Sequence, residues 1–188
     1  MTSKSHKKHA HLTKPRGGLF GQQEFAFIGA PCNIIQNLCN QLATQLKTDF
    51  ALGYADASHQ NETTPSAFKT SYIDLINHHG VHFKQNYIST HFRALFNSCD
   101  LVLVNGNHFL AKSQIVIVNE QKKVSLEKKL ERLTDVKIFI LDNGVKDLFP
   151  FIKEHIKNYK DIPLFSINDV NGIGETIKKI IGNCSIPI

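Results

Sequence analysis

The turn Gly29–Asn33 stands where an α/β protein would carry a phosphate-binding loop. It follows the apolar run Phe25–Ile28 and opens a stretch whose apolar residues recur with helical spacing. A nucleotide-hydrolysing loop reads G-x-x-x-x-G-K-[ST], because its lysine contacts the β- and γ-phosphates and its hydroxyl binds magnesium. The residues after Gly29 are, in order, Ala30, Pro31, Cys32 and Asn33. Positions 29–35 contain no second glycine, no lysine and no hydroxyl group, so the sequence predicts a phosphate-loop position without its catalytic groups.

Two interpretations of this turn stay open. Backbone N–H groups at the start of the following helix are able to bind an anion. Alternatively, the turn is a structural corner in which Asn33 caps the helix, while Pro31 removes one N–H donor. Cys32 adds a thiol at the same helix end, either as a reactive group or as a packing residue.

The run Leu101–Val104 is the natural place for the strand that delivers a magnesium-binding carboxylate. Its four apolar residues are followed by Asn105, which is neutral and therefore a weaker ligand for a hard cation. Both expected metal-phosphate elements are thus missing, and we expect neither a catalytic set nor a metal site.

Other polar residues also follow predicted strands, and ligands of open parallel sheets bind at the carboxyl ends of strands. Asp56 and His59 follow one strand and form either a ligand-binding group or an ordinary polar loop. His108 follows another, close to Asn105. The remaining histidines of the central region lack a supporting carboxylate or thiol, so we expect no metal there; they are His78, His79, His82 and His91.

The elements that position these residues alternate between strand and helix. The predicted strands are Phe25–Ile28, Phe50–Ala55, Leu101–Val104, Ile115–Val118, Lys137–Leu141 and Pro163–Ile167, with a short one at Val81–Lys84. The predicted helices are Asn33–Lys47, Ser71–Asn77, Ser89–Ser98, Val124–Leu133, Lys146–Tyr159 and Ile173–Ile181, the last capped by Asp169 or Asn171. This alternation predicts an α/β fold with a mostly parallel central sheet and helices on both faces, a three-layer sandwich like that of P-loop NTPases.

Length and charge favour one soluble domain with a basic tail. The chain has 188 residues and a net charge of +6, but five basic residues precede the first acid, Glu24. From there on, basic and acidic residues nearly cancel. We predict a basic extended arm at 1–23, one α/β domain at 24–182, and a linker at 183–188 that leads toward a second domain. The four cysteines form no C-x-x-C pair, which favours reduced thiols and a cytoplasmic location. No apolar run approaches the roughly 20 residues of a membrane span.

Several stretches together resemble one family. The arm at 9–15, the pair Phe20-Gly21 and the segment Glu24–Cys32 are similar to the start of Bacteroidetes-type molybdenum cofactor guanylyltransferases. In these proteins a MobB-like P-loop domain precedes a MobA-like nucleotidyltransferase domain. Tyr54–His59 resembles the polar segment after the second strand of MobB proteins. Asp100–Gly106 resembles their D-L-V-L-V-E-G segment, with Asn105 in place of the acid.

The resemblance implies a MobB-like domain that supports the joining of GMP to molybdopterin, which yields molybdopterin guanine dinucleotide. Its implied partner is a MobA-like guanylyltransferase domain, fused or separate, and its implied ligands are GTP or molybdopterin, bound weakly. MobB proteins bind GTP through a P-loop, and this chain lacks the lysine and the hydroxyl of that loop. We therefore expect a domain that is not catalytic by itself. A homodimer stays open, and we expect neither a membrane nor a nucleic acid as partner.

Two other functions stay open beside this one. The first is a small nucleotide-dependent transferase or hydrolase that uses the strand-end residues Asp56, His59, Asn105 and His108. The second, less favoured, is nucleic-acid binding through the basic residues 4–16.

Overall fold

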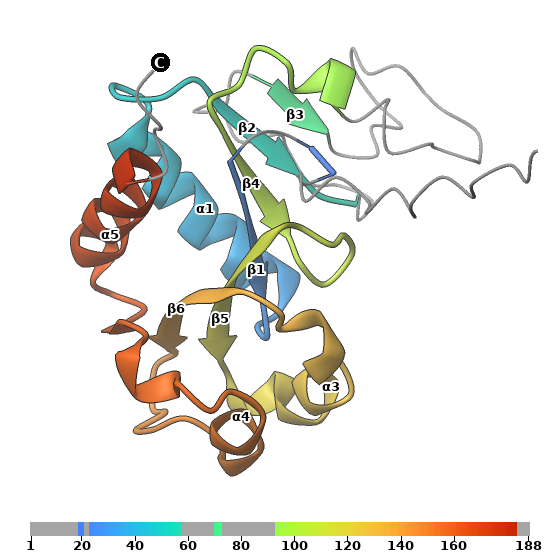
Figure 1. The fold of residues 1–188 in the computed structure, drawn as a ribbon, viewed down its shortest axis with the longest axis vertical. Coiled ribbons are helices and arrows are strands. Elements are labelled where there is room, and N and C mark those ends of the chain that lie inside the picture. Colours follow the sequence, from blue (N-terminus) through green and yellow to red (C-terminus); the bar gives the residue numbers. More distant parts are fainter. Residues whose placement is uncertain (1–18, 21–22, 58–69, 73–92, 184–188) are drawn as a thin grey trace, which may run out of the picture.

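A computed structural model describes residues 19–20, 23–57, 70–72 and 93–183 of the chain (Figure 1). Its centre is a seven-stranded sheet in the order β3-β2-β4-β1-β5-β6-β7, in which every neighbouring pair is parallel. The strands are β1 (Glu24–Ile28), β2 (Leu52–Ala55), β3 (Thr70–Tyr72), β4 (Leu101–Asn105), β5 (Ser113–Val118), β6 (Val136–Leu141) and β7 (Leu164–Ser166). The predicted α/β class is confirmed, and β1 lies beside β4 at the middle of the sheet.

Helices cover both faces of this sheet, as parallel strands require. The α-helices are α1 (Cys32–Leu46), α3 (Lys123–Glu127), α4 (Pro150–His155) and α5 (Val170–Asn183). Short 3₁₀ helices are η1 (Glu120–Lys122), η2 (Leu130–Arg132) and η3 (Tyr159–Asp161). Helices α1 and α5 lie together on one face, and α3 and α4 lie on the other.

The central strands are mostly apolar because they bury side chains on both faces. In β1, Phe25 and Phe27 point into the core under α1 and α5. The alternate residue Ile28 packs with Leu126 and Ile152 on the opposite face. Every residue of β1, β4 and β5 is buried, which explains why each contains a run of four apolar residues and lacks a polar alternation.

The last residues of the predicted arm contact the domain. Phe20 is fully buried and its ring packs edge-on against Phe96 and Phe109, with centroids 5.7 and 5.6 Å apart. The Glu24 carboxylate, 2% exposed, accepts hydrogen bonds from the backbone N–H groups of Leu19, Phe20 and Lys112. A buried carboxylate is stable with several donors, and here it joins the arm to the segment that precedes β5.

Three predicted elements differ from the structure. Residues 71–72, expected in a helix, belong to β3, because pairing with β2 extends the sheet at its edge. The helix expected at Val124–Leu133 ends at Glu127 and gives way to η2. The helix expected at Lys146–Tyr159 begins only at Pro150, whose fixed φ suits a first helical position. The strand expected at Val81–Lys84 and residues 89–92 of the helix expected at Ser89–Ser98 lie outside the described residues. Of the rest of that helix, residues 93–95 are helical and residues 96–98 form a turn.

Within the described part of the chain, no helix is long and apolar enough to cross a membrane.

Substitution of Gly29 tests whether the turn after β1 needs a glycine for its positive φ and its close approach to β5. Its φ is +101°, and an added Cβ would lie 2.4 Å from the carbonyl oxygen of Ile117. Strain and backbone collision together lead us to expect that Gly29→Ala lowers the free energy of unfolding by about 3 kcal/mol. Gly144 has φ +83° with nothing within 4 Å of an added Cβ, so Gly144→Ala should lose only about 1 kcal/mol. Equal losses in urea unfolding of the two variants would contradict the close approach to β5.

Candidate functional site

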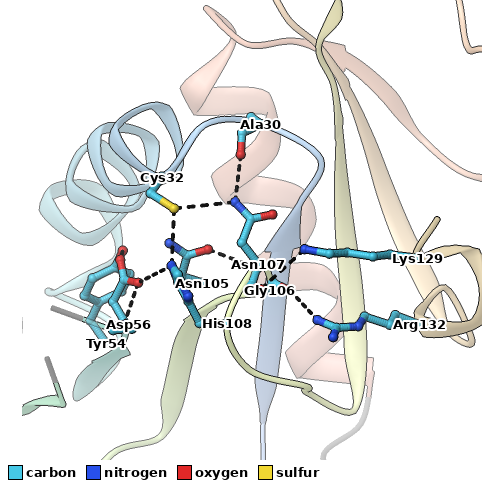
Figure 2. Close-up of polar contacts among 11 residues, drawn as sticks. Ala30, Cys32, Tyr54, Asp56, Asn105, Gly106, Asn107, His108, Lys129 and Arg132 are labelled. Atoms are coloured by element: carbon cyan, nitrogen blue, oxygen red, sulfur yellow. Dashed lines mark hydrogen bonds and ion pairs between the residues drawn. The ribbon is translucent and has the colours of Figure 1, made fainter. Parts of the chain in front are cut away.

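The carboxyl ends of β2, β4 and β1 lie level with one another. Ala55 is in register with Val104, and Phe27 with Asn105. The residues that directly follow β2 and end β4 are therefore neighbours at one edge of the sheet, and the N-terminus of α1 begins above the same edge. This arrangement explains why polar residues far apart in the sequence meet there (Figure 2).

The turn between β1 and α1 is too short to enclose a phosphate. β1 ends at Ile28 and α1 begins at Cys32, so only residues 29–31 connect them. Pro31 is the N-cap with ψ 147°, and its carbonyl accepts hydrogen bonds from the N–H groups of Ile34 and Ile35 at 3.0 and 3.1 Å. The expectation that Asn33 caps the helix is wrong, because the proline begins the helix earlier and leaves Asn33 exposed within its first turn.

The segment after β4 closes over this turn. The Asn107 side-chain amide donates to the carbonyl of Ala30 at 2.8 Å. The Asn107 backbone N–H in turn donates to Asn105 Oδ1 at 3.1 Å, and the N–H of His108 donates to the Asn105 carbonyl at 3.1 Å. Ala30 is fully buried as a result. Asn107 therefore contacts the backbone that a phosphate would approach in a phosphate-binding loop.

A thiol, an imidazole and a carboxylate lie in sequence along this edge. Cys32 Sγ is 3.3 Å from His108 Nε2, and the same nitrogen is 3.8 Å from Asp56 Oδ1. The His108 side chain is 26% exposed, whereas that of Asp56 is only 2% exposed. Solvent and ligands thus reach the imidazole, while the carboxylate stays behind it (Figure 2).

Asp56 is tightly bonded in its buried position. The Tyr54 hydroxyl donates to Asp56 Oδ2 at 2.6 Å, and the N–H of Ala57 donates to Oδ1 at 2.7 Å. Tyr54 is the next-to-last residue of β2 and Asp56 follows the strand. Residues two apart on an extended chain share a face, which brings the phenol within reach of the carboxylate. Burial, and then the nearby Cys39 and Asp56 groups, raise the pKa of the Tyr54 phenol far above its usual value. Tyr54 is therefore a permanent hydrogen-bond donor.

The Asn105 amide carries a buried donor without a partner. Its side chain is fully buried and Nδ2 has no hydrogen-bond partner among the described residues. The amide orientation follows from Oδ1, which accepts the hydrogen bond from the Asn107 N–H. Nδ2 consequently faces the side of Cys32 and His108 (Figure 2). Native structures leave few such donors unpaired, so this donor is available to a water molecule or a ligand.

Two cations approach the same loop from the far side. Lys129 Nζ donates to the Asn107 carbonyl at 3.4 Å, and Arg132 Nη1 donates to the Gly106 carbonyl at 3.3 Å. Neither forms an ion pair with a carboxylate in the described ranges. Partial burial, followed by repulsion from Arg132 and Lys122, lowers the pKa of the Lys129 ammonium. An anion bound here would relieve that repulsion.

The structure brings together most of the residues that the sequence singled out. Gly29, Ala30, Pro31 and Cys32 form the turn, and Asp56, Asn105 and His108 line it. Asn33 does not join them, and His59 lies outside the described residues. Sequence reasoning missed Tyr54, Asn107, Lys129 and Arg132. The position of Tyr54, two residues before Asp56, was a usable signal, whereas nothing in the sequence links Lys129 and Arg132 to β4.

Metal binding finds no support in these contacts. Among the residues with described positions, no three His, Cys, Asp or Glu side chains are arranged to hold a metal ion. The four histidines considered in the sequence, His78, His79, His82 and His91, all lie outside those positions.

Comparisons with protein-family models, with curated proteins and with solved structures find no significant match to this chain. The MobB resemblance accordingly remains a proposal.

Removing the Tyr54 hydroxyl tests whether the buried carboxylate depends on it. Tyr54→Phe takes one donor from a buried charge, so we expect a loss of about 2 kcal/mol in the free energy of unfolding. The matched control is Tyr159→Phe, because the hydroxyl of Tyr159 has no described hydrogen bond; we expect a change within about 0.5 kcal/mol. Chemical denaturation measures both, and a neutral Tyr54→Phe would show that Asp56 is not stabilised by the phenol.

Proposed function

We propose that this domain binds a phosphate-bearing ligand at the carboxyl edge of β1, β2 and β4 without hydrolysing a nucleoside triphosphate. In the MobB-like setting the ligand is GTP or molybdopterin. The domain then supports synthesis of molybdopterin guanine dinucleotide by contact with a guanylyltransferase domain, fused to it or separate.

One observation carries the non-hydrolytic part of the proposal. The connection between β1 and α1 consists of residues 29–31 only, and the Asn107 amide is hydrogen-bonded to the carbonyl of Ala30. The chain therefore lacks the phosphate-binding lysine, the magnesium hydroxyl and the space of a phosphate loop together. Asn105 ends β4 where a magnesium-binding carboxylate would be needed, and it is neutral.

The surrounding charges supply an alternative way to bind phosphate. Lys129 and Arg132 place two cations beside residues 106–107. The N-terminus of the 15-residue helix α1 adds a positive partial charge, and Asn105 Nδ2 adds a free donor. Cations and amide donors neutralise phosphate oxygens directly, so binding does not need magnesium.

The molybdenum cofactor setting rests on the sequence resemblance. Two of the resembling segments, Glu24–Cys32 and Asp100–Gly106, contain β1 and β4, which pair in parallel at the centre of the sheet. Their juxtaposition is what a shared ligand edge requires, and it supports treating the two segments as one functional unit.

A second candidate function is a nucleotide-dependent transferase or hydrolase that uses strand-end residues. The observation in its favour is that Asp56, Asn105 and His108 meet at one edge. This function requires that the protein turn over a nucleotide. It also requires that Asp56→Asn abolish that turnover while the protein stays folded.

Calorimetric titration separates these functions. We expect GTP to bind with similar affinity in magnesium and in EDTA, because side-chain cations contact the phosphates. Lys129→Gln should weaken binding by about tenfold. Lys146 is exposed and follows β6, which β5 separates from β1, so Lys146→Gln should leave binding unchanged.

The same titration with inorganic triphosphate shows which part of the ligand is recognised. Tighter binding of GTP supports a nucleotide site, and equal binding supports recognition of the phosphates alone. Absence of binding by both, or magnesium-dependent GTP hydrolysis, contradicts the proposed function.

A further inference from the structure

Ligand binding does not explain the contact between Cys32 and His108. The sulfur lies 3.3 Å from His108 Nε2 and accepts a weak hydrogen bond from Asn107 Nδ2 at 3.6 Å. Cys32 is also the first residue of α1, where the helix dipole favours negative charge. A base within reach of the thiol and a positive field at the sulfur are the two conditions that activate a cysteine nucleophile.

We propose that Cys32 is a nucleophile toward carbon electrophiles that carry an anionic group, with His108 as the acceptor of the thiol proton. The inference goes beyond ligand binding and does not depend on GTP being the ligand.

The carboxylate behind the imidazole completes this arrangement. Asp56 Oδ1 is 3.8 Å from the same Nε2 that contacts the sulfur. Asp56 therefore acts as a counter-charge to the imidazolium that forms and does not act through the other ring nitrogen. Tyr54 and the Ala57 N–H fix it in place.

Asn105 provides an independent indication that a ligand oxygen belongs beside the thiol. Its Nδ2 is fully buried, has no partner among the described residues, and faces the Cys32 side of the group (Figure 2). A buried donor that has lost water without gaining a partner is destabilising. An oxygen of the electrophile, once bound, would remove that destabilisation.

The preference for an anionic electrophile follows from the two cations. Lys129 and Arg132 contact the carbonyls of Asn107 and Gly106, and Asn107 itself contacts Cys32. The positive charge thus lies across one loop from the sulfur. Approach of an anion to this edge is favoured, and salt should screen the effect.

The other described cysteines lack these features. Cys39 is fully buried, and burial, followed by the charge of Asp56, raises the pKa of its thiol. Cys99 is 9% exposed and packs in the apolar cluster with Phe20 and Phe96. Cys39 is consequently an internal control for selectivity.

In the covalent step the Cys32 sulfur forms a bond to the electrophilic carbon. The bond from that carbon to its leaving group breaks, and the leaving group departs with the electron pair. The thiol proton moves to His108 Nε2. With iodoacetate as a probe, the product is carboxymethyl-Cys32, iodide and an imidazolium, so atoms and charge balance without a further reactant.

Alkylation rates with iodoacetate and iodoacetamide test the inference, read by mass spectrometry of the Cys32 and Cys39 peptides. We expect Cys32 to react at least about tenfold faster than glutathione, and Cys39 not to react while the protein is folded. The ratio of the iodoacetate rate to the iodoacetamide rate should exceed that of glutathione and should fall as salt is added.

Variants identify the groups responsible. His108→Gln should slow alkylation of Cys32 by about tenfold with either reagent. The double variant Lys129→Gln, Arg132→Gln should lower the ratio of the iodoacetate rate to the iodoacetamide rate but leave the iodoacetamide rate unchanged. Lys146→Gln should change neither the iodoacetate rate nor the iodoacetamide rate. Thermal unfolding shows whether each variant is folded.

The comparison of the Cys32 alkylation rate with that of glutathione needs only the wild-type protein, so it tests the proposal even where a variant fails to fold. A Cys32 rate no faster than that of glutathione would overturn the proposal. So would a fast rate that His108→Gln leaves unchanged in a folded protein. Binding of GTP by Cys32→Ser keeps the two proposals separable, because it tests the phosphate site without the thiol.

Discussion

The hydrogen bond from the Asn107 amide to the carbonyl of Ala30 is the contact on which the site depends. It joins the turn after β1 to the segment after β4, two regions 77 residues apart in sequence. The same residue orients Asn105 through its backbone N–H and touches the Cys32 sulfur through its amide. One side chain thereby closes the phosphate-loop position and directs a free donor and a thiol toward the same space.

The fold follows from the burial of its central strands. β1, β4 and β5 are buried on both faces, so each contains a run of four apolar residues that identifies a buried strand in the sequence. The sequence also offers Asp169 as one of two caps for α5, and Asp169 accepts the hydrogen bond from the Gly172 N–H at 2.9 Å. Thr70–Tyr72 could not be assigned this way, because its strand conformation comes from pairing with β2 and not from a local pattern.

From the sequence, only the site residues at the ends of strands could be predicted. Asp56, Asn105 and His108 were found by that rule, since the carboxyl ends of parallel strands share an edge. Lys129 and Arg132 come from the short helical segment after β5, and only tertiary packing brings them to the carbonyls of residues 106–107. Asn33 was misassigned because a proline at the N-cap starts the helix without a side-chain cap.

We propose above all that a phosphate-bearing ligand binds at the edge formed by the turn, the β4 end and the two cations. An NMR titration of the isotopically labelled protein with GTP in EDTA tests it most directly. We expect the amide signals of Cys32, Asn105, Asn107 and His108 to shift together, while those around Lys146 do not shift. Shifts confined to other parts of the molecule, or no shift at any concentration, would contradict it.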